Sequence, residues 1–359
     1  MDEKIVRLVR WAKGEKTPPL TLEINITNKC NLKCRMCWLR SSKPTQNEMS
    51  EEELRRVVED AIELGVKEFR FPGSGEPLMR KRILFQLMEM VKKEGREGLL
   101  ISNGTLFSEE DIKKLVEIEW DVLTISLDGP SAKVNDYIRG VIGSFQRVIK
   151  TLKFIKKWKS KLKKEKPWLR MNTVLTNKNY DKLESIVKLA KKYDFREVLL
   201  QPMTVFSKEG EKLRVTEIEK AKKCILRAEK LARRLKIKTN MMLIGKNVEM
   251  IEKVNQMEKM IEKEIRKFEN GFLATPCFEP FYNLIILPDG KISPCAIAGG
   301  IENINVRKRG LREIWFGEAL EKFRKRLLSK KLFSFCSHCC IPIFLENKRL
   351  RRELAKVIQ

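Results

Sequence analysis

Apolar runs typical of strands alternate with amphipathic helical segments between residues 21 and 202, and this alternation restricts the fold more than any other feature. In chain order the strand-like runs are TLEINI, EFRF, LLIS, DVLTIS, LRMNTVL and EVLLQP. Such a βαβ rhythm predicts a parallel sheet. Six strands are too few for a closed eight-stranded barrel, so we expect an α/β fold built on a partial (βα)6 TIM-like barrel. Its site should lie at the carboxyl ends of the strands.

Capping signals mark where several helices begin. Ser50 and Ser108 are each followed three residues later by an acidic residue, the spacing of a capping box, and Thr216 with Glu219 repeats the pattern. The helices expected in the barrel cover residues 50–64, 80–93, 108–118, 144–158 and 180–193. Beyond the barrel, helices are expected over residues 216–235, 248–268, 311–328 and 344–357.

The length of 359 residues predicts one large domain and a smaller one. We expect an N-terminal extension over residues 1–19 and a barrel domain over residues 20–205. Linking helices over residues 206–270 should then lead to a smaller C-terminal cysteine-rich auxiliary-cluster domain over residues 271–359. In the last of these, FYNLIIL and KISP flank Pro288-Asp289-Gly290. This turn sequence between two apolar runs predicts a β-hairpin.

The chain contains nine cysteines, and their use depends on the compartment. No run approaches the about 20 apolar residues of a membrane helix, and the charged N-terminal segment lacks an apolar signal core. We therefore expect a cytoplasmic protein without a transmembrane segment. Disulfides are rare in that compartment, so the cysteines are predicted to bind metal or a cluster.

Three of the cysteines, Cys30, Cys34 and Cys37, lie in one loop directly after the first strand-like run. Thiolates suit iron–sulfur clusters, and three of them can hold three irons of a cubane. The fourth iron is then free for an external ligand, as in catalytic metal sites that keep an open position. A zinc site is the alternative, although zinc loops usually use C-x2-C pairs and four ligands.

The C-x3-C-x2-C loop after the first strand of a repeated βα pattern resembles the signature of the radical S-adenosylmethionine (SAM) superfamily. The resemblance implies a [4Fe-4S] cluster on Cys30, Cys34 and Cys37 whose open iron binds the amino and carboxylate groups of SAM. In that family an electron from the reduced cluster cleaves SAM to methionine and a 5′-deoxyadenosyl radical, which abstracts hydrogen from a substrate.

The resemblance also implies SAM contacts elsewhere. The segment after the second strand is similar to a Gly-Gly-Glu-Pro motif whose main chain binds the methionine end of SAM; it consists of Gly73, Ser74, Gly75, Glu76 and Pro77. Further expected SAM-binding positions are Met36, Asn103, Ser126, Asp128, Arg139 and Gln201, with Asn172 as a contact to SAM or substrate. Taken alone, such residues are also typical of turns, helix caps, surface ion pairs and buried amides.

Four cysteines of the tail, Cys277, Cys295, Cys336 and Cys339, are enough to bind every iron of a second cubane. This region resembles the SPASM or twitch auxiliary-cluster domains of radical SAM enzymes, which implies one auxiliary [4Fe-4S] cluster here. A structural zinc knuckle is the alternative. Cys340 is expected to be a spare thiol.

The formal net charge of +27 is compatible with a nucleic acid or an anionic lipid as partner. We favour a thermophile's ion-pair-rich surface, since Lys, Arg and Glu are abundant and the chain has one histidine.

We therefore expect a radical SAM oxidoreductase, or an enzyme of a related radical SAM transformation, that oxidises or rearranges a small molecule or cofactor precursor. It would need an external electron donor such as ferredoxin or flavodoxin. No catalytic side chain is assigned. The alternatives are a maturase of a peptide or protein substrate, an RNA or lipid modifier, a non-enzymatic two-cluster electron carrier, and a zinc-stabilised RNA-binding protein.

Overall fold

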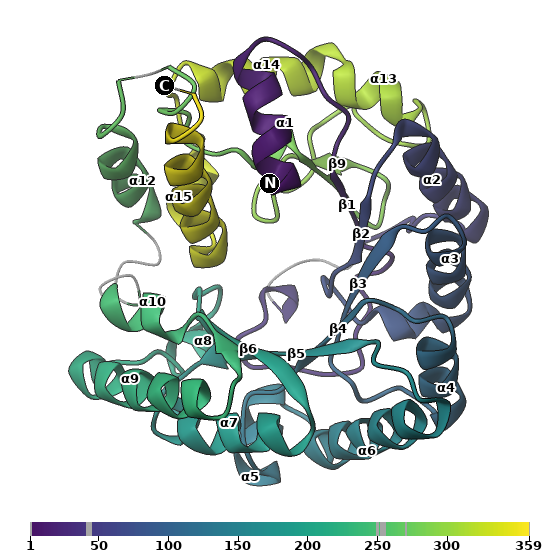
Figure 1. Ribbon diagram of the computed structural model, residues 1–359, viewed down its shortest axis with the longest axis vertical. Helices are drawn as coiled ribbons and strands as arrows, with labels where there is room; N and C mark the ends of the chain where they lie inside the picture. The colour runs from purple at the N-terminus through teal and green to yellow at the C-terminus, as the bar shows by residue number, and fades with distance from the viewer. Residues whose placement is uncertain (1, 41–44, 249–250, 252–255, 270, 359) are drawn as a thin grey trace.

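The computed structural model describes residues 2–40, 45–248, 251, 256–269 and 271–358. Within them a nine-stranded sheet has the order β7-β6-β5-β4-β3-β2-β1-β8-β9. Strands β1 to β6 are parallel and follow chain order. They curve into an arc with helices on its outer side, and β1 and β6 do not pair, so the barrel is open (Figure 1). The predicted partial barrel is confirmed.

The elements of the barrel are close to those expected. Its strands are β1 (Thr21–Ile24), β2 (Glu68–Phe71), β3 (Glu97–Ser102), β4 (Val122–Ser126), β5 (Trp168–Leu175) and β6 (Phe195–Pro202). Its outer helices are α2 (Glu51–Leu64), α3 (Lys81–Lys93), α4 (Glu109–Glu117), α6 (Ser144–Leu162) and α7 (Leu183–Lys192). The prediction missed α5 (Ala132–Arg139) and the short β7 (Lys238–Thr239), which pairs with β6 in parallel.

The two faces of the sheet differ in polarity, as β5 shows. Leu169, Met171 and Leu175 are buried, because they face the outer helices. Arg170 and Asn172 alternate with them, are partly exposed, and face the inside of the arc. Successive strand side chains point to opposite faces, so the alternation produces an apolar outer interface and a polar interior.

The tail extends the same sheet. Strand β8 (Asn283–Ile286) pairs with β1 in parallel, and β9 (Ile292–Ser293) pairs with β8 in antiparallel. The predicted hairpin around Gly290 is therefore confirmed. Gly290 has a positive φ of 81°, a conformation that favours glycine.

Two of the predicted capping boxes are present, and the third is not. Ser50 and Ser108 begin α2 and α4, and each exchanges hydrogen bonds with the acidic residue three positions later. Helix α9 (Ile218–Arg234) instead has Glu217 as its N-cap, without a side-chain cap bond. The Glu217 carboxylate accepts a hydrogen bond from the Tyr180 hydroxyl and pairs with Lys220. Tertiary contacts thus replace the expected cap of Thr216 and Glu219.

The helix predicted over residues 311–328 is broken at Gly317. Its two parts are α13 (Leu311–Phe316) and α14 (Glu318–Leu328), and Gly317 has an extended backbone with ψ 164°. A Cβ at Gly317 would lie 2.4 Å from the Glu313 carbonyl oxygen, so this break needs glycine. Buried Arg324 donates to the carbonyls of Trp315, at 2.8 Å, and Pro280, at 2.9 Å.

Other helices complete the fold. Part of the helix predicted over residues 248–268 lies outside the described residues; α10 (Met241–Lys246) precedes that part and α12 (Met257–Ile265) follows it. Helix α15 (Ile341–Ala355) was predicted, whereas α1 (Glu3–Ala12) was not. These two pack together through Leu8, Leu350 and Leu354, which brings the two ends of the chain side by side (Figure 1).

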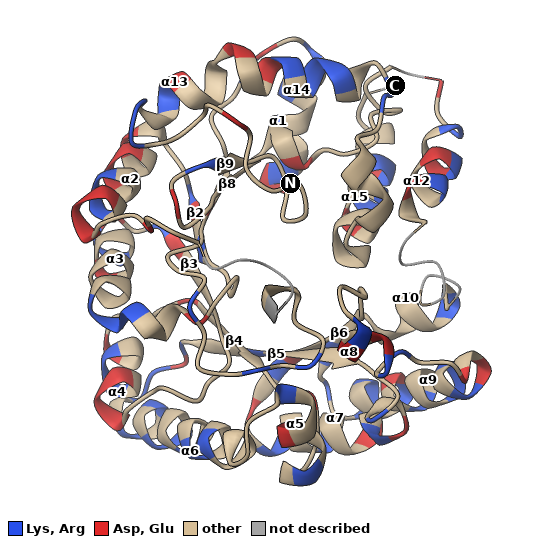
Figure 2. Cartoon of the chain, turned by 180° about the vertical axis from the view of Figure 1, so that it is seen from behind, with Lys and Arg blue, Asp and Glu red and all other residues tan. Residues whose placement is uncertain are grey.

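Basic and acidic side chains are interspersed on the outer helices (Figure 2). Examples of ion pairs between neighbouring helices are Lys114 with Glu89, at 2.7 Å, and Lys157 with Glu109, at 2.5 Å. No described helix combines the length and the apolar character needed to cross a bilayer.

Replacing Arg324 with methionine should destabilise the fold, because it leaves two buried carbonyls without a donor. An unsatisfied buried acceptor costs about 1–3 kcal/mol. Thermal unfolding should therefore show a clear decrease in Tm for Arg324→Met. Lys322→Met, at an exposed position of the same helix, should change it little. Equal Tm values for the two variants would contradict this account of Arg324.

Candidate functional site

The loop with Cys30, Cys34 and Cys37 leaves β1 at the carboxyl end of the barrel strands, as predicted from the sequence. The loop is tightly folded: the Cys37 amide donates to the Cys34 carbonyl at 3.1 Å, and the Leu32 amide donates to Cys30 Sγ at 3.5 Å. Although Cys30 reaches solvent, protein atoms surround much of its thiol, and this desolvation raises its pKa to about 11. Nearby Cys34, Glu76 and Cys37 act in the same direction.

Helix α5 holds the loop from one side. The backbone amides of Lys33 and Arg35 donate to the carbonyls of Arg139 and Ile138, at 3.3 and 3.0 Å. Gly140 ends the helix with a φ of 71°, and a Cβ there would lie 2.1 Å from the Lys33 carbonyl oxygen. The close approach of the two backbones therefore requires glycine at this position.

The motif after β2 holds the loop from the other side. A Cβ at Gly75 would lie 2.5 Å from the Lys29 carbonyl oxygen, and that oxygen accepts the Glu76 amide at 2.8 Å. The Ser74 hydroxyl donates to Asn28 Oδ1 at 3.0 Å. The remaining residues of the motif are Gly73, which follows β2, and Pro77, which begins the 3-10 helix η2 (Pro77–Arg80).

Glu76 connects the ends of two strands through its buried carboxylate. Oε1 accepts the Ser102 hydroxyl at 2.8 Å and the Leu78 amide at 3.2 Å, and Oε2 accepts the Asn103 amide at 2.7 Å. Burial raises the pKa of Glu76, and the bonds from Asn103, Ser102 and Leu78 oppose that rise. Because both oxygens already have protein donors, Glu76 is a positioning residue in this structure.

Asn103 lies beside the cysteine loop. Its Nδ2 donates to Asn31 Oδ1 at 2.9 Å and lies 4.0 Å from Cys30 Sγ. Its Oδ1 accepts the Thr105 amide at 2.9 Å. This predicted site residue is therefore brought next to the first cysteine.

A buried ion pair links β4 to the same loop. Arg139 Nε lies 2.8 Å from Asp128 Oδ2, and its Nη1 donates to Cys34 Sγ at 3.8 Å. Burial acts to lower the pKa of Arg139, but Asp128 and Cys34 outweigh it and raise the pKa. Arg139 thus places a fixed positive charge beside Cys34. The guanidinium, expected to contact SAM, is engaged by Asp128 and Cys34.

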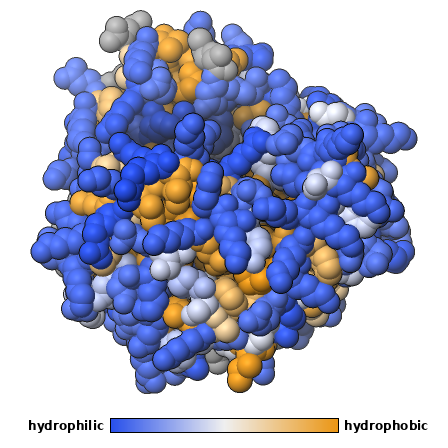
Figure 3. All heavy atoms as spheres, turned by 60° about the horizontal axis from the view of Figure 1, so that its bottom comes forward, coloured by the Kyte–Doolittle hydropathy of each residue, from blue (hydrophilic) through white to orange (hydrophobic). Residues whose placement is uncertain are grey.

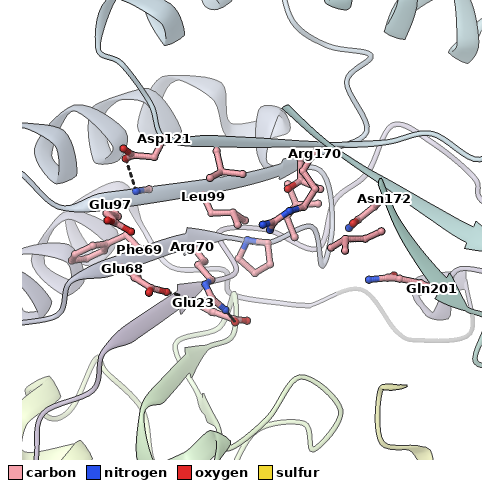
Figure 4. Close-up of a pocket in the computed structure, with 16 residues that line it drawn as sticks. Glu23, Glu68, Phe69, Arg70, Glu97, Leu99, Asp121, Arg170, Asn172 and Gln201 are labelled. Atoms are coloured by element: carbon pink, nitrogen blue, oxygen red, sulfur yellow. Dashed lines mark hydrogen bonds and ion pairs between the residues drawn. The ribbon is translucent and has the colours of Figure 1, made fainter. Parts of the chain in front are cut away.

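The interior of the arc contains a cavity lined by charged, polar and apolar residues (Figure 4). Thr124 Oγ1 and Asn172 Oδ1 are buried there and have no hydrogen-bond partner among the described residues. Gln201 also lines this cavity, from the carboxyl end of β6 (Figure 4). Ser126 ends β4 beside Asn172. These side chains leave hydrogen-bonding capacity for a ligand.

Charged pairs line the cavity and connect it to the tail. Arg70 pairs with Glu68 at 2.8 Å and with Glu23 at 3.3 Å. Asn283 Nδ2 in turn donates to Glu23 at 3.2 Å and to Glu279 at 2.9 Å. The sequence analysis did not identify the pairs of Arg70 with Glu68 and Glu23, nor Thr124, as cavity residues. Polar residues at alternate positions of the strands could have indicated them, because alternate side chains of a strand point to the same face.

Met36 lies on the cysteine loop next to α8 (Lys208–Glu211), which follows β6. A methyl group at Gly210 would be 3.9 Å from Met36 Cα. The predicted site residues therefore fall into two groups. One surrounds the cysteine loop, and the other, Asn172 and Gln201, lies inside the barrel.

The tail cysteines meet in one apolar cavity. Its lining includes Cys277, Cys295, Cys336, Cys339 and Cys340. Burial raises the pKa of every one of them, to about 11 for Cys295 and to about 12 for Cys340. Cys224 lies apart, buried in the core on α9, as expected of a packing residue.

Asn347 on α15 is a contact that the sequence did not reveal. Its Nδ2 donates to Cys277 Sγ at 3.6 Å, while its Oδ1 accepts the Phe278 amide at 2.6 Å. Phe333 and Phe335 stack at 5.1 Å along the same cavity. Apolar rings with amide donors near sulfur suit a buried cluster, whose potential depends on such hydrogen bonds and on solvent exposure.

Neither set of thiols has the geometry of a single-ion site. Among the described residues, no three Cys, His, Asp or Glu side chains converge on one metal position. Ligands of a cubane bind different irons and need not converge in this way, whereas zinc gathers four ligands around one ion. Sets of three and four thiolates are the donors that iron–sulfur clusters use.

Replacing Gly75 with alanine should disturb the cysteine loop, because the new Cβ would overlap the Lys29 carbonyl. After anaerobic reconstitution with iron and sulfide, Gly75→Ala should bind about half the iron of the unmodified protein, since the tail cysteines are unaffected. Gly271→Ala, which meets nothing within 4 Å, is the matched control. Full iron content in Gly75→Ala would show that the close contact between Gly75 and the Lys29 carbonyl is not needed for the cysteine loop to bind iron.

Two family models match the chain: the radical SAM superfamily over residues 24–161 and SPASM, an iron-sulfur cluster-binding domain, over residues 277–340. The Fe-coproporphyrin III synthase of Methanosarcina barkeri is 36% identical over 146 residues, 40% of this chain and 35% of that protein. An AdoMet-dependent heme synthase of Oleidesulfovibrio alaskensis is 30% identical over 46% of this chain and 40% of its own. The matches thus span well under half of these two relatives.

A cofactor-modifying protein for the tungsten-containing aldehyde ferredoxin oxidoreductase of Pyrococcus furiosus is 23% identical over 89% of this chain and 87% of its own. Among solved structures, Streptococcus suis SuiB bound to its precursor peptide SuiA has a TM-score of 0.66 with 17% identity, covering 89% of this chain and 69% of SuiB. The AdoMet-bound anSMEcpe structure has a TM-score of 0.63 with 18% identity, covering 94% and 93%. The structural likenesses show a shared fold. With both family models matched in order, the chain carries a domain of the radical SAM superfamily, whose cofactors are SAM and a [4Fe-4S] cluster, and a C-terminal SPASM iron-sulfur domain.

Proposed function

We propose that this protein uses SAM as a radical source to oxidise or rearrange a small molecule or cofactor precursor. One observation carries the proposal: a three-cysteine loop, held between α5 and the motif after β2, faces a barrel interior that contains unpartnered polar atoms. An electron carrier would need neither the motif nor the polar cavity. We place the barrel domain at residues 20–205, the linking helices at 206–270 and the auxiliary-cluster domain at 271–359.

Cys30, Cys34 and Cys37 would hold the cluster that binds SAM. When bound and reduced, that cluster supplies the electron that cleaves SAM to methionine and a 5′-deoxyadenosyl radical. Arg139 keeps a positive charge beside Cys34. Glu76 keeps the loop after β2 in register with the end of β3.

We assign SAM binding to the residues around this loop. The main chain of the motif after β2 would bind the methionine end, and the other contacts would come from Met36, Asn103, Ser126, Asp128 and Arg139. In this assignment Asp128 acts by orienting Arg139. Gln201 lines the cavity together with Thr124 and Asn172, so we assign these three residues to orient the substrate there.

Cys277, Cys295, Cys336 and Cys339 would hold the auxiliary cluster, with Cys340 as a spare thiol in the same cavity. The chain of contacts from Arg70 through Glu23 and Asn283 reaches Glu279, two residues from Cys277. Side-chain contacts therefore connect the proposed substrate cavity to the segment that carries Cys277. This placement would let the auxiliary cluster accept an electron from the substrate or help to position it.

The relatives favour a small substrate. Their names include Fe-coproporphyrin III synthase, pre-heme d1 synthase and GTP 3′,8-cyclase, all of which act on small molecules. Peptide maturation is the second candidate, supported by a match to the subtilosin biosynthesis protein AlbA of Bacillus subtilis, 30% identical over 138 residues. Soaking the anaerobic protein separately with a coproporphyrin, GTP and short peptides, and measuring which one suppresses uncoupled SAM cleavage, would separate the two classes.

The central experiment compares one variant of each cluster site after anaerobic reconstitution. The unmodified protein should hold about eight irons, two cubanes' worth. It should release 5′-deoxyadenosine from SAM with dithionite. Cys34→Ala should lose about four irons and this activity. Cys336→Ala should lose a similar amount of iron but still cleave SAM, because the two sets of thiols share no ligand.

Iron and 5′-deoxyadenosine are measured on the same preparations, so a folding failure would appear as loss of both. If the unmodified protein contains a full complement of iron yet releases no more 5′-deoxyadenosine than Cys34→Ala, it is an electron carrier and the proposed enzyme is wrong. Colourless protein with stoichiometric zinc would instead identify a zinc-stabilised protein.

A further inference from the structure

A shallow depression lies on the outer side of the cysteine loop, and its lining shares no residue with the cavity inside the barrel. It is lined by α5 and the turn after it, and its lining includes Arg35, Lys133, Tyr137, Val141 and Ile142. Ile142 is 92% exposed and Tyr137 is 44% exposed. Helix α5 lies at the edge of the molecule, away from the tail (Figure 2).

Ile142 is the most exposed of the large hydrophobic residues in the described part of the chain. Hydrophilic side chains cover most of the face in Figure 3, and apolar residues gather there in separate patches. A large aliphatic side chain that is almost fully exposed, next to a half-exposed aromatic ring, marks a candidate contact site for another protein.

The depression is directly connected to the cysteine loop. Arg35, which lies between Cys34 and Cys37 in sequence, donates from Nε to the Tyr137 carbonyl at 2.9 Å, and its guanidinium stacks on the Tyr137 ring at 4.5 Å. Two residues further along α5, Arg139 donates to Cys34 Sγ. A partner bound here would therefore be separated from the thiolates of the loop by little more than one layer of side chains.

The rim of the depression is basic. Lys33, Lys133 and Lys178 are exposed around it, and Lys178 Nζ lies 5.7 Å from the centre of the Tyr137 ring. Two acidic groups lie nearby. Glu209 pairs with Arg35 at 3.3 Å, and Asp136 accepts hydrogen bonds from the amides of residues 143 and 145 and from the hydroxyl of residue 144. The net charge presented to a partner is positive.

We propose that this patch, formed by Arg35, Lys133, Tyr137, Val141, Ile142 and the flanking Lys33 and Lys178, docks a small acidic one-electron carrier protein. The inference rests on the proposed function, since it assumes a cluster on the cysteine loop. One electron leaves the reduced centre of the carrier and enters that cluster, with no bond made or broken. An apolar centre with a basic rim suits a transient complex, in which opposite charges speed association and a small apolar contact permits release.

The test uses a double variant, Lys133→Glu with Ile142→Glu, and two reductants. The probe carrier is a bacterial flavodoxin, an acidic protein, reduced by NADPH and its reductase; dithionite is the small reductant that needs no docking. With flavodoxin the variant should form 5′-deoxyadenosine at least tenfold more slowly than the unmodified protein. With dithionite the two rates should agree within twofold, which also shows that the variant is folded and loaded.

The matched control carries the same change of charge elsewhere: Lys230→Glu on α9 with Leu328→Glu, an exposed residue of α14. This control variant should form 5′-deoxyadenosine at the same rate as the unmodified protein with both reductants. Raising the salt concentration from 50 to 500 mM should slow the flavodoxin-driven rate of the unmodified protein several-fold and leave the dithionite rate unchanged, because screening weakens attraction between exposed charges.

Three results would overturn the docking proposal: a flavodoxin-driven rate that the Lys133 and Ile142 variant retains, an equal loss in the control variant, or an unmodified protein that flavodoxin cannot reduce. Each is distinct from failure of the proposed function. If dithionite itself yields no 5′-deoxyadenosine with the fully loaded protein, the enzyme assignment fails. If dithionite works and only the flavodoxin results differ from expectation, the docking surface alone is wrong.

Discussion

The buried carboxylate of Glu76 is the contact on which the candidate site depends most. Its two oxygens tie the turn after β2 to the end of β3, while the neighbouring Gly75 lets that turn pack directly on the backbone of the cysteine loop. A carboxylate can do this because it accepts several hydrogen bonds at once and its charge strengthens each of them. The loop, the turn and the ends of two strands are thereby held as one unit at the open end of the barrel.

The two faces of the sheet have different roles, one in the stability of the barrel and the other in lining the cavity. Outward side chains such as Met171 are packed under helices and supply the stability of the barrel, whereas inward ones such as Arg170 and Asn172 line the cavity. Because the tail adds β8 to the free edge of β1, the second group of thiols is attached to the same sheet as the first. A rigid shared sheet keeps the two cluster sites and the cavity in a constant relation, which a flexible linker would not.

Tertiary contacts decided several features that local sequence could not. The capping signal at Thr216 was overridden because Glu217 bonds to Tyr180, which is distant in sequence. The break at Gly317 depends on the space beside the Glu313 carbonyl and on Arg324, whose acceptors come from two separate segments. Likewise, Arg139 was predicted to be a site residue, but its engagement with Asp128 and Cys34 required the folded chain.

By itself the sequence determined the class of fold, the two groups of cysteines and the order of the motifs, because strand alternation, thiol spacing and glycine turns are local properties of the chain. Only the tertiary structure decided which polar groups remain without partners inside the barrel, that five thiols share one apolar cavity, and that Arg35 and Tyr137 form a basic, half-exposed surface behind the cysteine loop. Each of these depends on residues far apart in sequence. The burial and the charge of these residues depend on how distant segments pack together, and a local sequence pattern does not contain that information.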